Sequence, residues 1–211
     1  MPADFSGHVA TLPTDLRGAY ELRLRVFSDE QGYDCDRDID SLDDVAVPVV
    51  LVHAGAVCAV LRILPYPLPD VTERYFSPSV LTGGTLPGQG RSEESMVAYM
   101  AGQQKIVAST DNGAAVVLSG GKLGRIAVSS AVRGMGHGRR IVLAAEAWLQ
   151  QALRDASAAR DADRVDARVQ LSAQVTARAF YERLGYAGAG EPYLEEGQPH
   201  MWYAKVIRVR G

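Results

Sequence analysis

The stretch that decides the fold runs from Leu123 to Arg139 and reads LGRIAVSSAVRGMGHGR. Its first part, Leu123–Val128, is mostly apolar and predicts a strand. Its last part, Arg133–Arg139, is a glycine-rich turn, and apolar residues that recur every three or four positions between 141 and 152 predict a helix after it. Such a turn offers free backbone N–H groups and the positive end of the helix dipole. The unit therefore predicts a site for a phosphate or pyrophosphate group.

The turn alone does not identify this ligand, because a tight turn into a helix often needs glycine for steric reasons. A dinucleotide-binding fingerprint would place G-x-G-x-x-G directly after the strand, whereas here Arg133 leads the glycines and the unit lies late in the chain. A P-loop would require Gly-Lys-Ser or Gly-Lys-Thr at the end of the turn, and that sequence does not occur here.

Apolar periodicity predicts further elements before this unit. Residues 14–32 predict an amphipathic helix with Thr14 as its cap, after a short apolar lead. Residues 47–53 and 57–64 are apolar and rich in β-branched side chains, so they predict a hairpin. Between the helix and the hairpin, residues 34–44 hold six aspartates and predict a loop.

Other elements follow the glycine-rich unit. Strict alternation over residues 164–171 predicts a half-buried strand, and residues 177–184 predict a short helix closed by Gly185 in the left-handed conformation. Residues 200–209 predict the last strand. Trp148 and Trp202 fall on core-facing positions and are expected to pack there.

We interpret residues 1–211 as one domain that carries an insertion at about residues 65–121. Prolines and glycines interrupt this insertion, and only residues 95–107 are apolar enough to predict regular structure. A stretch of this kind is either a mobile decoration or a functional lid.

Composition excludes several classes of protein. The net charge is −3 without a basic stripe, which argues against nucleic acid as a partner. Cys35 and Cys58 have no metal-ligand spacing, so neither a metal site nor a disulfide framework is expected. The N-terminus lacks the features of a secretory signal, and no apolar run is long enough to cross a membrane. We therefore expect a cytoplasmic protein, with the nucleus as the open alternative.

Two segments of the chain resemble signatures of the GNAT superfamily of N-acetyltransferases. The run from Arg133 to Gly138 is similar to its R-x-x-G-x-G/A motif, and Phe180–Tyr186 is similar to its F-Y-x-x-x-G-F segment. Residues 24–31, 123–128 and 195–200 resemble the ElaA-like branch, although the insertion is foreign to its compact members.

This resemblance implies an α/β GNAT fold, in which a mixed, mostly antiparallel central sheet is splayed around a coenzyme A cleft and helices cover both faces. It implies acetyl-CoA as the acyl donor, attacked directly by the primary amine of a small molecule in a ternary complex. The oxyanion would be held by backbone N–H groups of the strand before the turn. The residues implied to bind the donor are Ile126, Ala127, Val128, Arg133, Gly134, Met135, Gly136, His137, Gly138, Arg139, Gln174 and Phe180.

Two residues are the catalytic candidates. Tyr181 stands at the family's general-acid position, and its alternative is packing in the core beside Phe180. His200 begins the last strand, where the family's acceptor pocket lies; an imidazole can accept protons near neutral pH, but this one could instead hydrogen-bond a neighbouring loop. Glu195 and Glu196 are expected in a solvated turn more than as a base.

The acceptor is left open between several chemistries. The aspartates of residues 34–44 would attract a cationic amine, or form a solvated loop. An amino-sugar phosphate and the amine of a peptide or protein are alternatives. A non-catalytic acyl-CoA-binding module is a further one, because a fold does not guarantee its chemistry. The apolar final strand allows a homodimer.

Overall fold

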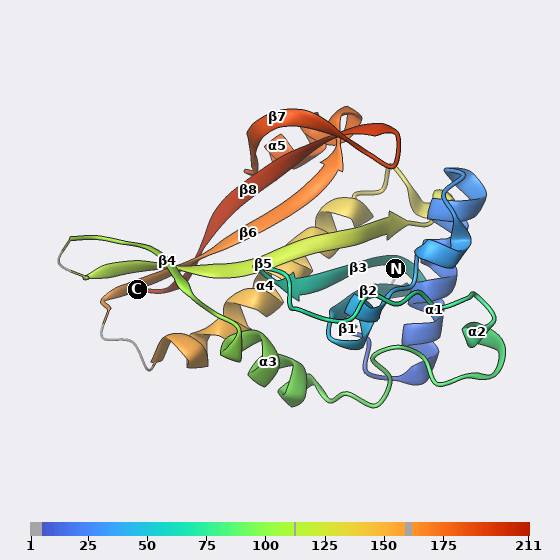
Figure 1. Cartoon of the computed structure of the whole chain (residues 1–211), viewed down its shortest axis with the longest axis horizontal. Helices are drawn as coiled ribbons and strands as arrows, with labels where there is room; N and C mark the ends of the chain where they lie inside the picture. The colour runs from blue at the N-terminus through green and yellow to red at the C-terminus, as the bar shows by residue number, and fades with distance from the viewer. Residues whose placement is uncertain (1–5, 112, 159–161) are drawn as a thin grey trace.

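The computed structural model describes residues 6–111, 113–158 and 162–211, and one sheet runs through them (Figure 1). Its strands follow the order β1-β2-β3-β5-β6-β8-β7, and β4 pairs with β5. Among the strands in these ranges, only β5 and β6 are parallel neighbours. The strands are β1 (Ser6–Val9), β2 (Val47–His53), β3 (Ala56–Pro65), β4 (Ile106–Ser109), β5 (Ala115–Val128), β6 (Arg164–Gln174), β7 (Ala187–Glu195) and β8 (Gln198–Arg210). This mixed, mostly antiparallel arrangement confirms the predicted fold class.

Helices cover both faces of the sheet (Figure 1). The helix α4 (His137–Ala158) packs on the face where Val49 of β2 and Leu123 of β5 are buried. The helix α1 (Pro13–Leu24) packs on the other face, against Val50 and Val60. Successive strand residues point to opposite faces, so the apolar runs of β2 and β3 are explained by burial on both sides.

The parallel strands β5 and β6 separate at one end of the sheet. They pair from Ala115 and Arg164 as far as Leu123 and Leu171. Beyond that point β5 stays paired with β3, and β6 stays paired with β8 up to Gln174. Each strand thus follows its outer neighbour, and a gap opens between their carboxyl ends. The splayed sheet implied by the resemblance is present.

Regular structure is found where it was predicted within the insertion, at residues 95–107, but the insertion also contributes other elements to the fold, which corrects its interpretation. The strand predicted at 123–128 begins at Ala115, so the boundary at 121 was wrong, and β4 pairs beside it. The helix α3 (Glu93–Gly102) lies against α4, with Met96 and Met100 in the core. Residues preceding α3, which include α2 (Val80–Gly83), are anchored where the Tyr20 hydroxyl donates to the carbonyl of Pro87 at 2.8 Å. The assignment of residues 1–211 to one domain stays a prediction.

Most periodic elements were predicted correctly. The hairpin, the alternating strand β6, the final strand and the helix α5 (Arg178–Arg183) are found, and Gly185 has φ +85°. Thr14 is not the cap of α1, because that helix already begins at Pro13, with Leu12 at the capping position. The sequence did not predict β7, which lies at an edge of the sheet and is exposed over most of its length.

Both tryptophans are only partly buried. Trp148 packs against the core as predicted, and its indole Nε1 donates to Glu93 of α3 at 2.8 Å. Trp202 is half-buried, and its ring lies edge-on to Tyr66 with 6.2 Å between the ring centroids.

Candidate functional site

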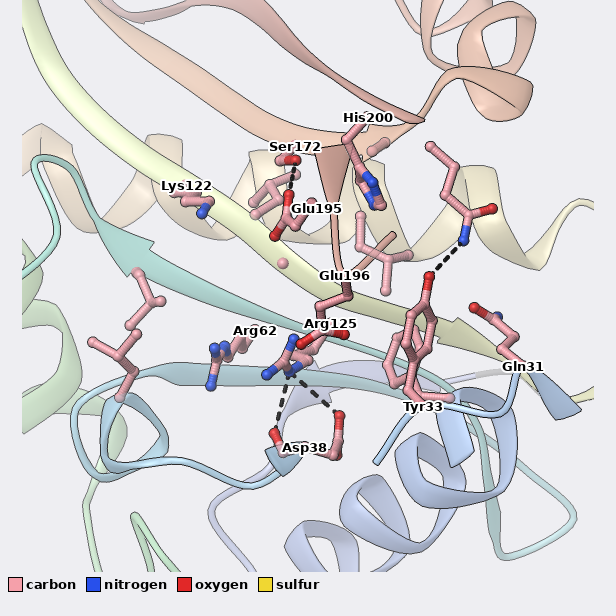
Figure 2. A pocket seen from close by; sticks show the side chains of 18 of the residues that line it. Gln31, Tyr33, Asp38, Arg62, Lys122, Arg125, Ser172, Glu195, Glu196 and His200 are labelled. Carbon is pink, nitrogen blue, oxygen red and sulfur yellow. Dashed lines mark hydrogen bonds and ion pairs between the residues drawn. The ribbon is translucent and has the colours of Figure 1, made fainter. Parts of the chain in front are cut away.

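A cavity of about 330 Å³ lies where β5 and β6 separate (Figure 2). Segments from six parts of the chain line it. The first is residues 27–42 after α1, where a π-helix (Arg25–Glu30) is followed by two short 3-10 helices (Cys35–Arg37 and Ser41–Asp44). The others are the end of β3 with Leu68 after it, residues 122–126 of β5, residues 172–174 of β6, Ala177 with Tyr181 of α5, and the turn between β7 and β8. The splay of the sheet therefore builds the cavity.

The β7–β8 turn brings a carboxylate into this cavity. Glu195 accepts hydrogen bonds from the Ser172 hydroxyl at 2.6 Å and from the Tyr193 hydroxyl at 3.2 Å. Partial burial by itself would raise the pKa of Glu195, but the Ser172 hydrogen bond and the positive charges of His200 and Lys122 lower it below its usual range. Glu195 is therefore an anion at neutral pH.

His200 also lines the cavity, and its tautomer is fixed by a neighbour. Its Nδ1 lies 2.9 Å from the carbonyl oxygen of Gln198. A carbonyl can only accept, so Nδ1 carries the hydrogen and Nε2 of the neutral ring keeps its lone pair. Both interpretations of His200 thus describe the same residue: it bonds the adjacent turn and it faces the cavity. Its catalytic role stays a prediction.

Three basic side chains also line the cavity: Arg62 and Arg125 lie near Asp38, and Lys122 lies near Glu195 (Figure 2). Arg125, which has φ +50° where the β3–β5 register shifts, directs its guanidinium to Asp38 at 3.3 Å and to Asp40 at 3.4 Å. Lys122 forms no hydrogen bond or ion pair with any residue in the described ranges, and its ammonium lies 5.0 Å from the centroid of the Trp202 ring. Burial lowers the pKa of Lys122, and the charges of Arg62 and Arg125 add to that effect, whereas Glu195 opposes it.

Asp38, Asp40 and Asp43 form a buried ion network, which corrects both interpretations for this part of residues 34–44, whereas Asp34 and Asp36 are exposed as a solvated loop requires. Arg23 contacts Asp38 at 3.0 Å and Asp43 at 2.7 Å, and these side chains are at most 4% exposed. Arg62 contacts Asp40 at 2.7 Å and Asp43 at 2.9 Å. Buried aspartates that neutralise arginines are neither a solvated loop nor an attractant for cationic substrates.

The glycine-rich turn lies beside the cavity but does not line it. Gly134 and Gly136 have φ values of +79° and +82°, which explains the need for glycine, and α4 begins at His137. The Arg133 guanidinium donates to the carbonyl of Val128 at 3.0 Å and pairs with Glu30. Arg133 therefore braces the turn against β5.

The side chains predicted to bind the donor are divided between the turn and the cavity. Ile126 and Gln174 line the cavity, and Gln174 donates to the Tyr33 hydroxyl at 3.2 Å. A Cβ added at Gly138 would lie 3.3 Å from the Phe180 ring, so the two signature segments are in contact. The rest are distributed as follows: Met135 and Arg139 are exposed, Ala127 and His137 are buried, and Val128 packs partly buried against the core. Burial lowers the pKa of His137.

Tyr181 is buried yet reaches the cavity. Its ring packs edge-on to Phe180 with 4.9 Å between the centroids, and lies 5.5 Å from that of Tyr203. Burial raises the pKa of Tyr181 to about 12. The packing role and the position at the cavity coexist, and the role of hydrogen-bond donor stays a prediction.

Sequence reasoning missed several cavity residues. Glu195 was expected in a solvated turn, because β7 was not predicted. Lys122 and Tyr33 were not predicted as site residues, although both line the cavity. The signal for Lys122 was its position directly before the predicted strand Leu123–Val128. Among the residues that the structure describes, the one cluster of metal-ligand type is the exposed set Asp34, Cys35 and Asp36. None of the helices over those residues has the length and apolarity needed to span a membrane.

Comparisons with known proteins agree with this geometry. Residues 85–207 match the family model of the acetyltransferase (GNAT) domain. The UPF0039 protein sll0451 of Synechocystis is 36% identical over 86 residues, which are 41% of this chain and 47% of that protein. The chain thus matches about half the length of this curated relative.

Solved structures match over almost the whole chain. A candidate N-acetyltransferase from Lactobacillus plantarum has a TM-score of 0.60 at 22% identity, covering 96% of this chain and 97% of that one. An acyl-CoA N-acyltransferase from Pseudomonas aeruginosa has a TM-score of 0.53 at 18% identity, covering 96% and 99%. The AHL synthase LasI has a TM-score of 0.54 at 15% identity, covering 99% and 91%. At these identities the likeness shows a shared fold.

Proposed function

We propose a reaction for this chain, which belongs to the GNAT acetyltransferase domain family. It transfers the acetyl group of acetyl-CoA to the primary amine of a small molecule. Membership of this family brings an acyl-CoA N-acyltransferase fold. The choice of acetyl donor, small acceptor and direct attack is our proposal.

One observation carries this proposal: the gap between β5 and β6 joins the strand before the glycine-rich turn to the cavity that holds Glu195 and His200. The donor would place its pyrophosphate on the N–H groups at the start of α4, where the helix dipole favours an anion. Its thioester would then lie beside Ile126, where β5 is no longer paired with β6. An acceptor amine would approach from the cavity.

The cavity supplies groups for each proton transfer. An ammonium group would be attracted by the Glu195 anion, and Nε2 of His200 would take its proton. The neutral amine then attacks the thioester carbon, and backbone N–H groups of β5 would hold the oxyanion. The C–S bond breaks, the nitrogen loses its second proton to the thiolate that leaves, and Tyr181 would donate a hydrogen bond to that sulfur.

Calorimetric titration with acetyl-CoA tests the donor site. We expect binding by the wild-type chain and its loss in Gly136→Asp, because the new carboxylate repels the pyrophosphate. Gly113→Asp is the matched control: both glycines have positive φ, and a Cβ at either position meets no atom within 4 Å, but Gly113 lies at the opposite end of β5. Absence of binding by the wild-type chain, or equal loss in both variants, would refute the donor site.

Turnover on an amine panel tests the catalytic part. For His200→Gln we expect kcat/KM to fall about 100-fold, as is usual when a general base is lost, with acetyl-CoA binding retained. Glu191→Gln is the control, because Glu191 is a titratable residue that is exposed on β7 and lies outside the cavity. Its replacement should leave kcat/KM unchanged. Binding of acetyl-CoA without turnover on any amine would favour the non-catalytic acyl-CoA-binding module.

A further inference from the structure

The cavity holds two opposite charges, on Glu195 and Lys122, that do not form an ion pair with each other. Glu195 is held by two hydroxyl groups, whereas Lys122 has no hydrogen-bond or ion-pair partner within the described ranges. Each shifts the pKa of the other, so they are near neighbours, yet they do not form an ion pair. Figure 2 shows both side chains on the same stretch of the cavity.

The Trp202 ring lies 5.0 Å from the Lys122 ammonium but supplies neither an anion nor a hydrogen-bond acceptor, and a half-buried ammonium that lacks both is unfavourable unless a ligand completes it. The nearby aspartates do not supply that partner, because Asp38, Asp40 and Asp43 are bonded to Arg62 and Arg125. The two arginines add positive potential beside Lys122. This part of the cavity is therefore suited to one anionic group of a ligand.

The cavity also has an apolar part close to Lys122. Leu64 pairs with Lys122 across β3 and β5, and Leu68, which follows β3 in sequence, also lines the cavity. Leu68 is 41% exposed, so its side chain still has apolar surface to cover. A ligand that binds here needs an apolar substituent next to its anionic group.

We infer that the acceptor is an α-amino acid with an apolar side chain, bound with its carboxylate on Lys122, its amine at Glu195 and His200, and its side chain on Leu64 and Leu68. This inference rests on the proposed function and names its substrate class. A zwitterion places a positive and a negative charge a few bonds apart, which matches the unpaired charges of the cavity. Lys122 would be a specificity residue, since it contacts the acceptor and takes no part in the proton transfers.

The experiment compares acceptors that differ in one group. With acetyl-CoA as the donor we would measure kcat/KM for leucine, leucinamide, 3-methylbutylamine and 2-aminoethyl phosphate. We expect kcat/KM for leucine to exceed that for leucinamide and 3-methylbutylamine, which lack the carboxylate, by ten- to a hundredfold. This is the range for one charge-assisted hydrogen bond. Equal rates for leucine and leucinamide, or a preference for 2-aminoethyl phosphate, would overturn the inference.

Variants of Lys122 separate recognition from folding. Lys122→Gln should reduce the ratio of the leucine value to the leucinamide value from ten- to a hundredfold to about one, because the carboxylate loses its partner. Lys122→Arg should retain the preference. Lys105→Gln, at an exposed lysine outside the cavity, should change neither. Parallel losses for leucine and leucinamide in Lys122→Gln would mean a structural role and would contradict the inference.

Binding measurements keep this result distinct from a failure of the proposed function. Calorimetric titration of leucine into the wild-type chain should give binding that Lys122→Gln loses, whether or not acetyl transfer follows. Leucine binding without turnover would retain the inferred site and reject the acetyltransferase reaction. Turnover on amines with no preference for the carboxylate would retain the reaction and reject the site.

Discussion

Burial decides what each candidate side chain can do. An unperturbed thiol has a pKa near 8.5, and the pKa of about 12 at Tyr181 makes full proton transfer from its hydroxyl to a thiolate unfavourable by about 5 kcal/mol. Glu195 is affected in the opposite sense, because its partners favour the anion. Tyr181 can therefore donate a hydrogen bond without giving up its proton. Glu195 can attract a cation while it stays deprotonated.

Removal of the Tyr181 hydroxyl should consequently have a moderate effect. We expect Tyr181→Phe to lower kcat by about tenfold, the value of one hydrogen bond, and not by the 100-fold or more that follows loss of a true general acid. Steady-state kinetics at saturating acetyl-CoA measures this.

Tyr203→Phe is the matched control for that change. The Tyr203 hydroxyl is buried without a hydrogen-bond partner among the described residues, and its ring packs beside that of Tyr181. Its removal should leave kcat unchanged. A loss beyond 100-fold in Tyr181→Phe would show that a proton is transferred, and no loss at all would leave Tyr181 a packing residue.

At the scale of elements, β5 determines the site through two irregularities. Near its middle, Gly120 has φ +68° where the β5–β6 register shifts, and further along Arg125 has φ +50° where the β3–β5 register shifts. Bulges of this kind bend a strand and increase its twist. Between these irregularities lies Lys122, and beyond Leu123 the strand leaves β6. The bulges therefore direct β5 along β3 and away from β6.

Gly120 should tolerate no side chain. A Cβ at this position would lie 1.9 Å from the carbonyl oxygen of Arg168, so Gly120→Ala requires β6 to move. We expect the free energy of unfolding to fall by about 3 kcal/mol, as for strained and overpacked sites. Gly124→Ala is the control, because its Cβ meets nothing within 4 Å. Chemical denaturation compares the two, and equal stability would show that the bulge is not required.

Prediction from sequence succeeded where the local pattern of residues was enough to identify an element. Val165, Ala167, Val169 and Leu171 alternate with polar residues and are all fully buried, and the glycine-rich turn lies between a strand and a helix as expected. The strand β7 was missed because Ala187–Gly190 shows no alternation that a buried face would impose. Its absence from the prediction also removed Glu195 from the candidate site.

At the scale of the whole molecule, the ion network joins segments that are far apart in sequence. Arg23 from α1, Arg62 from β3 and Arg125 from β5 meet on the aspartates of residues 38–43. The network fixes the region after α1 against the sheet, and with it one wall of the cavity. A count of aspartates could not reveal this, because the arginine partners lie 15 to 87 residues away. The cavity could not be predicted from the sequence for the same reason, because its lining residues are also brought together by tertiary contacts.

This network should dominate the pH dependence of stability. Burial alone would raise the pKa of Asp43, but Arg23 and Arg62 hold it well below its usual range. The lowered folded-state pKa means that Asp43 stabilises the fold fully above the unfolded-state value of about 3.9 and progressively less as the pH falls below it. Asp43→Asn should therefore lower the free energy of unfolding by about 3 to 5 kcal/mol at pH 7, because it leaves buried arginine charge uncompensated.

The difference in the free energy of unfolding between Asp43→Asn and the wild-type chain should shrink as the pH falls from about 5 towards 2. Over this range Asp43 of the unfolded wild-type chain takes up a proton, so its carboxylate contributes less to the stability of the fold. Urea denaturation at a series of pH values measures it. Asp36→Asn, an exposed aspartate of the same stretch, should stay within about 0.5 kcal/mol of wild type at every pH. A difference for Asp43→Asn that is independent of pH would mean that packing, and not charge, makes the network stabilising.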